Sequence, residues 1–456
     1  MPTRSLLTGL VFVSLVTLIN SFTAPAAEPA TTFAGWTQAA PRDELRTEYV
    51  IEAGGRDGLG ALVLRTDARE GLDGYWRKSF PVTGGTHYRF AASYQARGVT
   101  VPRRSVVVKL NWRDANDKQV LLDEPSEGSY QRGAVPRAET EFPATHEPAA
   151  DGWTEVADVY RAPAKATQAI VELHLQWAPN AEVRWSQISL REAAAPERRV
   201  VRLATVHYMP RGGKSPAENC RQYEPLIVEA AKQKADLVVL GETLTYVGLN
   251  KSYAELAEPV PGPSTEYFAE LAKQHQLYIV AGLLERSEHL VYNVAVLLGP
   301  DGQIAGKYRK VCLPRSEIEQ GCAPGSDYPV FETRFGKLGM MVCYDGFFPE
   351  VARELTNRGA EVIAWPVWGC NPLLARARAC ENHVYLISST YGDVAANWMI
   401  SAVFDHTGET IAQASKWGSV AVVEVDLNHR TRWVSLGDYR AHLPRHRPVA
   451  VSEPTR

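Results

Sequence analysis

The sequence predicts two folded parts, an all-β sandwich at residues 28–193 and an α/β unit at residues 200–430. In the first part, short alternating apolar runs recur between turn residues, which is the pattern of paired antiparallel strands. In the second part, continuous apolar runs alternate with helical stretches, which is typical of a sheet covered on both faces. A segment at residues 194–199, with a proline and several charges, is the expected linker.

The first 27 residues have the features of a secretory signal peptide. Arg4 precedes an apolar run at residues 6–19, and small residues at 24–27 form an Ala-x-Ala-like cleavage site. The run is shorter than the roughly 20 residues that a membrane-spanning helix needs. An uncleaved membrane anchor is the alternative. We expect export to the periplasm or the exterior, with a mature chain that begins near residue 28.

The β part has seven expected strands, at residues 61–64, 75–80, 88–94, 105–112, 154–157, 169–175 and 183–190. Their order resembles the galactose-binding-like jelly rolls, a class that includes many carbohydrate-binding modules. Five aromatic residues here have two interpretations, as core residues or as a platform on which a carbohydrate stacks. They are Tyr75, Trp76, Trp112, Trp153 and Trp177.

In the α/β part, one cysteine stands between a predicted strand and a predicted helix. Cys343 ends the apolar run of residues 338–342, Asp345 and Gly346 suggest a turn, and Pro349 suits the first turn of a helix. A nearby helix N-terminus would lower the pKa of the thiol. A buried, inert cysteine is the alternative.

Two charged residues argue against that alternative, because they also follow apolar strands. Glu242 comes after the run at residues 237–240, and Lys310 comes after the strand-like residues 291–298 and a turn. Open α/β sheets place their sites at such strand ends. A carboxylate, an ammonium group and a thiol at three strand ends therefore predict a shared site.

With these motifs in this order, the chain resembles the nitrilase superfamily, also called the carbon-nitrogen hydrolases, over roughly residues 200–430. The motifs are LVVLGE at 237–242, YNVA at 292–295, YRKVCLP at 308–314, PG at 324–325, GMMVCYD at 339–345, FPEVAR at 348–353, RACEN at 378–382 and DHTG at 405–408. The resemblance implies an α-β-β-α sandwich, with two sheets face to face and helices outside. It also implies that Glu242 is the general base, Lys310 the oxyanion stabiliser and Cys343 the nucleophile.

These residue types suit the hydrolysis of an amide. A thiol is an effective nucleophile for a carbonyl carbon, a carboxylate can accept its proton, and a cation with a backbone N–H can stabilise the oxyanion. The amide of Tyr344 is the candidate backbone donor. We expect no metal and no cofactor, since the histidines and cysteines lack zinc-type spacing.

A second carboxylate beside the lysine is also implied by the resemblance, on the loop at residues 315–325. Glu317 and Glu319 are both candidates, and the spacing to Pro324 slightly favours Glu319.

Two departures from the family pattern leave the catalytic roles intact. Cys312 stands where many relatives have His, and Gly241 precedes the glutamate where Pro is commoner.

Composition excludes some classes of partner. The formal net charge of −3 and the 22% of charged residues favour neither nucleic acid nor an anionic membrane. Six cysteines are few for an exported chain of 456 residues, so disulfides are not its framework. If Cys343 stays a thiol, at most two bridges can form, and Cys312 with Cys322 or Cys370 with Cys380 are the pairs considered.

Three functions stay open. The first is a hydrolase that cleaves a linear amide or an N-carbamoyl compound to an acid plus ammonia or an amine, with acyl transfer to an amine as a variant. The second is a nitrilase, although nitrilases typically have Trp-Glu where this chain has Tyr344 and Asp345. The third is a non-catalytic secreted binding protein, against which the complete set of catalytic residue types argues.

Trp365 and Trp368 follow an apolar strand near the predicted nucleophile, so we expect them to line the substrate pocket; ordinary packing is the alternative. Relatives commonly pair through their outer helices, so the resemblance implies a homodimer or a higher oligomer, which the β part could block. Residues 431–456 are the expected C-terminal extension.

Overall fold

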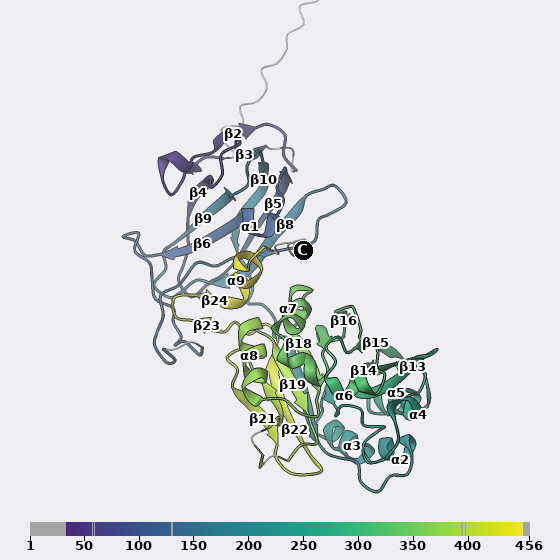
Figure 1. Cartoon of the computed structure of the whole chain (residues 1–456). Helices are drawn as coiled ribbons and strands as arrows, with labels where there is room; N and C mark the ends of the chain where they lie inside the picture. The colour runs from purple at the N-terminus through teal and green to yellow at the C-terminus, as the bar shows by residue number, and fades with distance from the viewer. Residues whose placement is uncertain are drawn as a thin grey trace, which may run out of the picture.

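The computed structural model describes residues 33–449, apart from 57, 59, 129, 130, 394 and 397. The predicted signal peptide lies outside the described residues. An N-terminal β-sandwich and a C-terminal α/β part are joined by the segment between β10 (Glu182–Glu192) and β11 (Val200–His207) (Figure 1). This is where the linker was predicted. Among the described residues, no helix combines the length and apolar character needed to cross a membrane.

Two antiparallel sheets form the N-terminal part. One has the order β1 (Thr37–Ala39), β4 (Asp73–Pro81), β9 (Gln168–Gln176), β6 (Val106–Arg113). The other has the order β2 (Glu48–Glu52), β3 (Ala61–Arg65), β10, β5 (His87–Arg97), β8 (Thr154–Arg161), β7 (Ala144–Thr145). Two short helices, η2 (Asp43–Leu45) and α1 (Pro102–Ser105), lie in the connections. Residues of both sheets share one apolar core, so the part is all-β as predicted. The jelly-roll assignment stays a prediction.

The five aromatic residues with two interpretations do not form one exposed platform on this sandwich. Trp76, Trp112 and Trp153 are buried, the first two in the shared core. Tyr75 stacks on His174, and Trp177 is exposed beneath the guanidinium of Arg104. The alternation of apolar residues places every second side chain of a strand inside, so core packing is the correct interpretation for the buried tryptophans.

The α/β part contains two six-stranded sheets. The first has the order β15 (Ile304–Arg309), β14 (Leu290–Leu298), β13 (Tyr278–Ser287), β12 (Leu237–Val239), β11, β22 (Ser419–Asp426). The second has the order β16 (Val330–Glu332), β17 (Lys337–Met340), β18 (Val362–Pro366), β19 (Tyr385–Ser389), β20 (Ser401–Phe404), β21 (Thr410–Ala414). The central strands β11, β12 and β13 run parallel, as do β17, β18 and β19.

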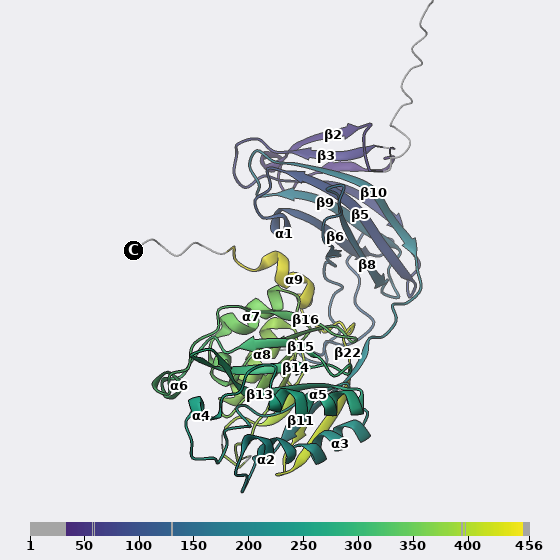
Figure 2. The ribbon, with the colours of Figure 1, turned by 90° about the vertical axis from the view of Figure 1, so that its right-hand side faces the viewer.

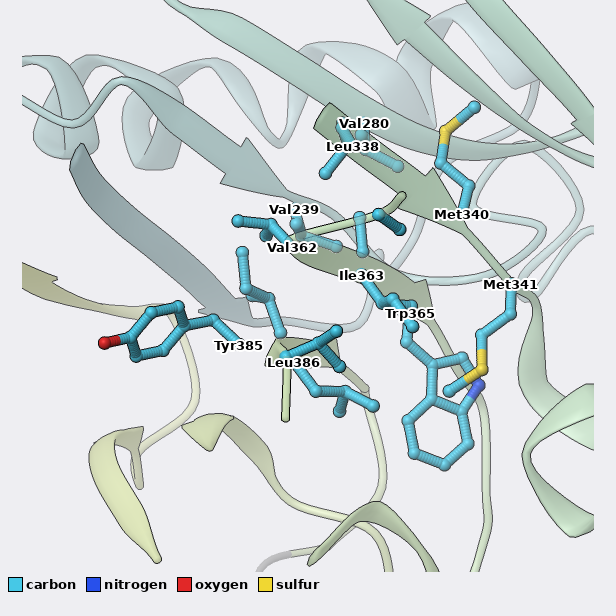
Figure 3. Close-up of a cluster of buried hydrophobic side chains, with 14 of the residues drawn as sticks. Val239, Val280, Leu338, Met340, Met341, Val362, Ile363, Trp365, Tyr385 and Leu386 are labelled. Carbon is cyan, nitrogen blue, oxygen red and sulfur yellow. The ribbon is translucent and has the colours of Figure 1, made fainter. Parts of the chain in front are cut away.

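Helices cover the outer faces of these sheets. The longer ones are α2 (Pro216–Arg221), α3 (Glu224–Lys232), α5 (Pro263–His275), α7 (Pro349–Asn357) and α8 (Pro372–Asn382); short ones are α4 (Tyr253–Leu256), α6 (Arg315–Glu319) and η3 (Cys343–Phe347). Helices α2, α3 and α5 share a core with the first sheet, and α7 and α8 pack with the second. Side chains of the two sheets meet between them, as Val239 and Val280 meet Val362 and Leu338 (Figure 3). The predicted α-β-β-α order is therefore present.

This layering explains the unbroken apolar run before Glu242. Val238 belongs to the outer core beneath the helices, whereas Val239 belongs to the inner core between the sheets. A parallel strand buried on both faces has no solvent side on which a polar residue could lie. The run therefore ends only where the strand leaves the sheet, and Glu242 stands just beyond that point.

The C-terminal extension lies between the two parts. It contains β23 (Arg432–Trp433), β24 (Gly437–Asp438) and α9 (Tyr439–His446) (Figures 1 and 2). Arg430 pairs with Asp158 at 2.5 Å and Arg432 with Glu141 at 2.9 Å, so basic residues near this extension meet acids of the sandwich. All six cysteines are free thiols, so neither disulfide considered above is present.

Candidate active site

Cys343 stands at the predicted strand-turn-helix junction. Strand β17 ends at Met340, Cys343 opens the short helix η3, and Pro349 begins α7. The backbone φ of Cys343 is 40°, a left-handed conformation that is uncommon outside glycine and is often found at functional sites. Its side chain is only 8% exposed, and its Sγ atom lies 3.5 Å from the Gly369 carbonyl oxygen. The thiol is thus held in one direction by the turn.

Asp345 fixes that turn. Its buried carboxylate accepts hydrogen bonds from the Val342 amide at 2.9 Å, the Cys312 amide at 2.8 Å and the Tyr308 hydroxyl at 2.8 Å. These bonds join the nucleophile turn to the end of β15, two residues from Lys310. From the sequence, Asp345 is expected only as a turn residue, and its role as the link between the two segments was missed.

Trp365 lies behind the turn and not in a pocket. It is fully buried, and its indole Nε1 donates to the Cys343 carbonyl at 3.2 Å. A Cβ atom on Gly346 would come within 2.0 Å of the indole, so only glycine allows the turn to pass so close. The prediction that Trp365 lines the substrate pocket is therefore wrong: on β18 this side chain points into the core.

Glu242 is buried just past the end of β12 and is held from several sides. One carboxylate oxygen accepts from Asn293 Nδ2 at 2.8 Å and from Lys310 Nζ at 3.0 Å. The other accepts from the Trp368 amide at 2.8 Å. Glu242 also acts on the Cys343 thiol as a neighbouring charge and a hydrogen-bond partner. The three residues predicted from strand ends are thus brought together.

Lys310 is fully buried between two carboxylates. Its Nζ lies 3.0 Å from Glu242 Oε1 and 2.6 Å from Glu317 Oε1. Burial acts to lower the pKa of this ammonium group, but the carboxylates of Glu242 and Glu317 outweigh it and hold the pKa well above the ordinary value. Lys310 is therefore a fixed cation at neutral pH, as an oxyanion stabiliser requires.

The slight preference for Glu319 as the second carboxylate is wrong. Glu319 is exposed and pairs with Arg315 at 2.6 Å, whereas Glu317 is buried against Lys310. Residues two apart on a helix point to different sides, so α6 presents only one of the two acids to the site. Burial raises the pKa of Glu317, opposed by Lys310 and reinforced by Glu242. A pair of carboxylates therefore shares one cation.

Asn293 is a site residue to which the sequence analysis assigned no role. It is buried on β14, and its Nδ2 atom donates to Glu242 at 2.8 Å and to Glu317 at 3.1 Å. The available signal was a lone amide within the nine-residue apolar strand Leu290–Leu298. A buried amide in such a strand needs partners, and here the partners are the two acids.

The thiol itself departs from the sequence expectation. Burial raises the pKa of Cys343 well above its ordinary value, Glu242 raises it further, and Lys310 opposes both. The expected lowering by a helix N-terminus is thus outweighed by desolvation. The cysteine rests as a thiol, so nucleophilic attack requires an adjacent base. The amide of Tyr344 lies in the first turn of η3, where backbone N–H groups lack a partner within the helix.

The α/β part of the chain is similar to known proteins. A family model described as carbon-nitrogen hydrolase matches residues 202–434. An omega-amidase of Xenopus tropicalis is 31% identical over 266 residues, which cover 53% of this chain and 92% of that protein. A nitrilase of Pyrococcus abyssi is 39% identical over 225 residues, covering 46% of this chain and 85% of that protein. A solved carbon-nitrogen hydrolase of Helicobacter pylori is 26% identical and covers 50% of this chain and 90% of its own, with a TM-score of 0.44.

Proposed function

The chain belongs to the carbon-nitrogen hydrolase family, and we propose that it hydrolyses a non-peptide amide or an N-carbamoyl compound through a cysteine thioester. The observation that carries the proposal is the position of Glu242, which is bonded to Lys310 at 3.0 Å and acts on the Cys343 thiol. A protonated thiol, a carboxylate beside it and a fixed cation are the three groups that acyl transfer to sulfur needs.

In the first half of the reaction, Glu242 takes the proton from Cys343 as the sulfur attacks the carbonyl carbon. The raised pKa of the thiol makes this transfer part of the attack, because little thiolate exists beforehand. Negative charge then develops on the carbonyl oxygen, where Lys310 and the Tyr344 amide stabilise it. When the C–N bond breaks, Glu242 returns the proton to the departing nitrogen, which leaves as ammonia or an amine.

In the second half, a water molecule attacks the thioester and Glu242 accepts its proton. The C–S bond breaks, the proton returns to sulfur, and the carboxylic acid leaves. One amide and one water thus give one acid and one ammonia or amine, and the thiol is regenerated. An amine in place of water would give acyl transfer by the same steps.

Each carboxylate has its own part in this scheme. Glu242 moves protons, whereas Glu317 and Asn293 hold Lys310 and Glu242 in place. Burial raises the pKa of Glu317, with Lys310 opposing and Glu242 reinforcing the shift. Glu317 is thus a positioning residue.

A nitrilase is the second candidate, since one relative carries that name at 39% identity. Hydrolysis of a nitrile to an acid and ammonia consumes two waters and begins with the same sulfur attack. A screen of the mature protein against small amides, carbamoyl amines and nitriles, with ammonia release as the readout, separates the candidates. We expect turnover of amides or carbamoyl amines. Turnover of nitriles alone would overturn the amidase proposal in favour of nitrilase, and no Cys343-dependent turnover of any class would overturn both.

A further inference from the structure

One short segment touches both the base and the nucleophile. The Trp368 amide donates to Glu242, and the Gly369 carbonyl lies 3.5 Å from the Cys343 sulfur. A second segment is tied to it, because the Thr390 hydroxyl donates to the Trp368 carbonyl at 2.7 Å. The second segment therefore lies beside the one that contacts the thiol.

Trp398, on the second segment, packs directly on Gly369. A Cβ atom at residue 369 would lie only 1.9 Å from the indole nitrogen of Trp398, so glycine is what allows the ring to sit there. The indole therefore packs on the same residue, Gly369, whose carbonyl oxygen faces the Cys343 thiol. The indole is nevertheless 39% exposed, so one part of it is free to meet a substrate.

Other large apolar side chains on the nucleophile segment and on the segment of Gly369 are also exposed. Trp368 is 59% exposed and Leu373, at the start of α8, is 65% exposed. Phe347 and Phe348 follow the nucleophile turn, and both contact the Tyr344 ring while remaining partly exposed. Exposed apolar side chains that gather at one place commonly mark a binding surface.

Charge is scarce on the same segments. Residues 365–375 contain no charged side chain, and residues 389–401 contain only Asp393, which is negative. Lys310 already faces two carboxylates, and Arg378 of α8 pairs with Glu381 at 2.9 Å. A substrate with a carboxylate on its acyl part would therefore lie among apolar and acidic groups, without a cation from these segments.

We propose that Phe347, Phe348, Trp368, Leu373 and Trp398 form an apolar acyl subsite, and that the substrate is an amide of an aliphatic or arylalkyl carboxylic acid without a second charge. This inference rests on the proposed amide hydrolysis and specifies which acyl groups the site accepts. An apolar acyl chain loses water against the exposed rings, whereas an acyl carboxylate would be desolvated without a partner.

The test compares pentanamide with glutaramate, which have equal chain length and differ in a terminal methyl or carboxylate. We expect kcat/KM for pentanamide to exceed that for glutaramate by on the order of 10²-fold or more, because a buried unpaired charge is rejected more strongly than a missing contact. Equal values, or a preference for glutaramate, would overturn the apolar subsite while leaving the hydrolase assignment intact. Absence of turnover of both, together with failure in the wider screen, would instead remove the proposed function and this inference with it.

Variants then locate the subsite. Trp398→Ala should lower kcat/KM for pentanamide and phenylacetamide by about 10-fold or more through KM, and for acetamide by less than about threefold. Trp398→Phe should restore most of the loss, since it returns an apolar ring to Gly369. The matched control is Trp177→Ala, which removes an exposed tryptophan from the sandwich. A uniform loss on all three amides at Trp398→Ala would show that the ring only supports the backbone and would refute the subsite.

Discussion

The ammonium group of Lys310 lies 3.0 Å from a carboxylate oxygen of Glu242, and both side chains are buried. Glu317 approaches the same ammonium group from another side at 2.6 Å. Removing one partner from a buried charge cluster leaves the rest uncompensated, which is far more costly than at the surface. The chemistry and the stability of this site therefore depend on the same three side chains, and variants must be checked for folding as well as for rate.

We predict that Cys343→Ala abolishes turnover while the protein stays folded. The group that is lost is small, but its sulfur is the atom to which the acyl group would be attached. Removal of the nucleophile from a group that acts as a unit should reduce kcat by on the order of 10³-fold or more. Ammonia release measures the loss of turnover, and circular dichroism measures whether the variant stays folded. Cys380→Ala is the matched control, and ammonia release at the wild-type rate by folded Cys343→Ala would eliminate the thioester mechanism.

The pair Glu317 and Glu319 gives a second test, because the two acids are two residues apart on α6 and differ in burial. We expect Glu317→Gln to lower kcat by on the order of 10²-fold, since Lys310 loses one of its two anionic partners. Its pH–rate profile should shift as well, because that partner helps to raise the pKa of Lys310. Glu319→Gln should change kcat by less than about twofold, as expected for an exposed ion pair. The reverse order of effects would contradict the assignment.

This pair also shows how far the sequence could predict the site. Glu242, Lys310 and Cys343 each stand at the end of an apolar strand, and the sheet topology brings strand ends to one place. The choice between Glu317 and Glu319 depends instead on the rotation of a five-residue helix in a loop. Local sequence does not determine that rotation, so spacing alone favoured the wrong acid.

The other incorrect predictions concern properties that depend on how deeply a side chain is buried. The pKa of Cys343 follows from desolvation and the nearness of Glu242, which depend on contacts between distant segments. Trp365 and Trp368 are three residues apart on one segment, yet the first is core and the second is exposed. Strand alternation distinguishes buried from exposed positions only within a strand. The end of β18 would therefore have to be known before the two tryptophans could be told apart. The strand pattern thus predicted the layers, whereas side-chain environments required the packed structure.

Acid should destabilise the fold through His383, which packs against Trp433 and Tyr439 of the C-terminal extension. This residue is buried, neither ring nitrogen has a hydrogen-bond partner, and it stacks on His406 at 5.5 Å. Burial lowers its pKa to about 4, with Asp438 opposing and Arg440 reinforcing the shift. The unfolded chain, with a pKa near 6.5, therefore binds the proton first, so stability present above about pH 6.5 is lost as the pH falls toward 4. The full loss from this residue is on the order of 3 kcal/mol.

The measurement is the urea unfolding midpoint at pH 8 and pH 5 for the wild type and His383→Phe. Phenylalanine keeps the ring and cannot be protonated, so the variant should lose less stability between the two pH values. His289→Gln, at an exposed turn, is the control and should behave as the wild type does. Equal acid sensitivity in all three proteins would mean that His383 does not drive the loss.

Export is predicted by the N-terminal residues, and we propose that the mature chain begins near Ala27 or Glu28. Small residues at 24–27 suit signal peptidase after the apolar run. N-terminal sequencing of the protein from its native envelope measures the start directly. Retention of Met1 or Pro2 on membrane-bound protein would support the anchor alternative.

The last prediction concerns the division of labour between the parts. All the groups proposed to act in catalysis lie after residue 200, so a fragment of about residues 198–456 should keep its kcat on a small amide. Its stability should fall, because Arg430 and Arg432 lose Asp158 and Glu141, and Arg445 loses the Pro143 carbonyl. Buried cations without partners lower the stability of the fold. Removal of the sandwich also exposes apolar surface, which promotes aggregation.

Two measurements separate these effects. The unfolding midpoint of the fragment should lie well below that of the whole chain, whereas kcat measured on the soluble, folded fraction should stay within a few-fold. Full-length Arg432→Gln is the matched variant, since it breaks the Glu141 contact without removing the sandwich. It should lower the midpoint and leave kcat unchanged. A hundredfold loss of kcat in the folded fragment, about 2.7 kcal/mol in the barrier, would mean that the sandwich completes the active site, and the proposed separation of roles would fail.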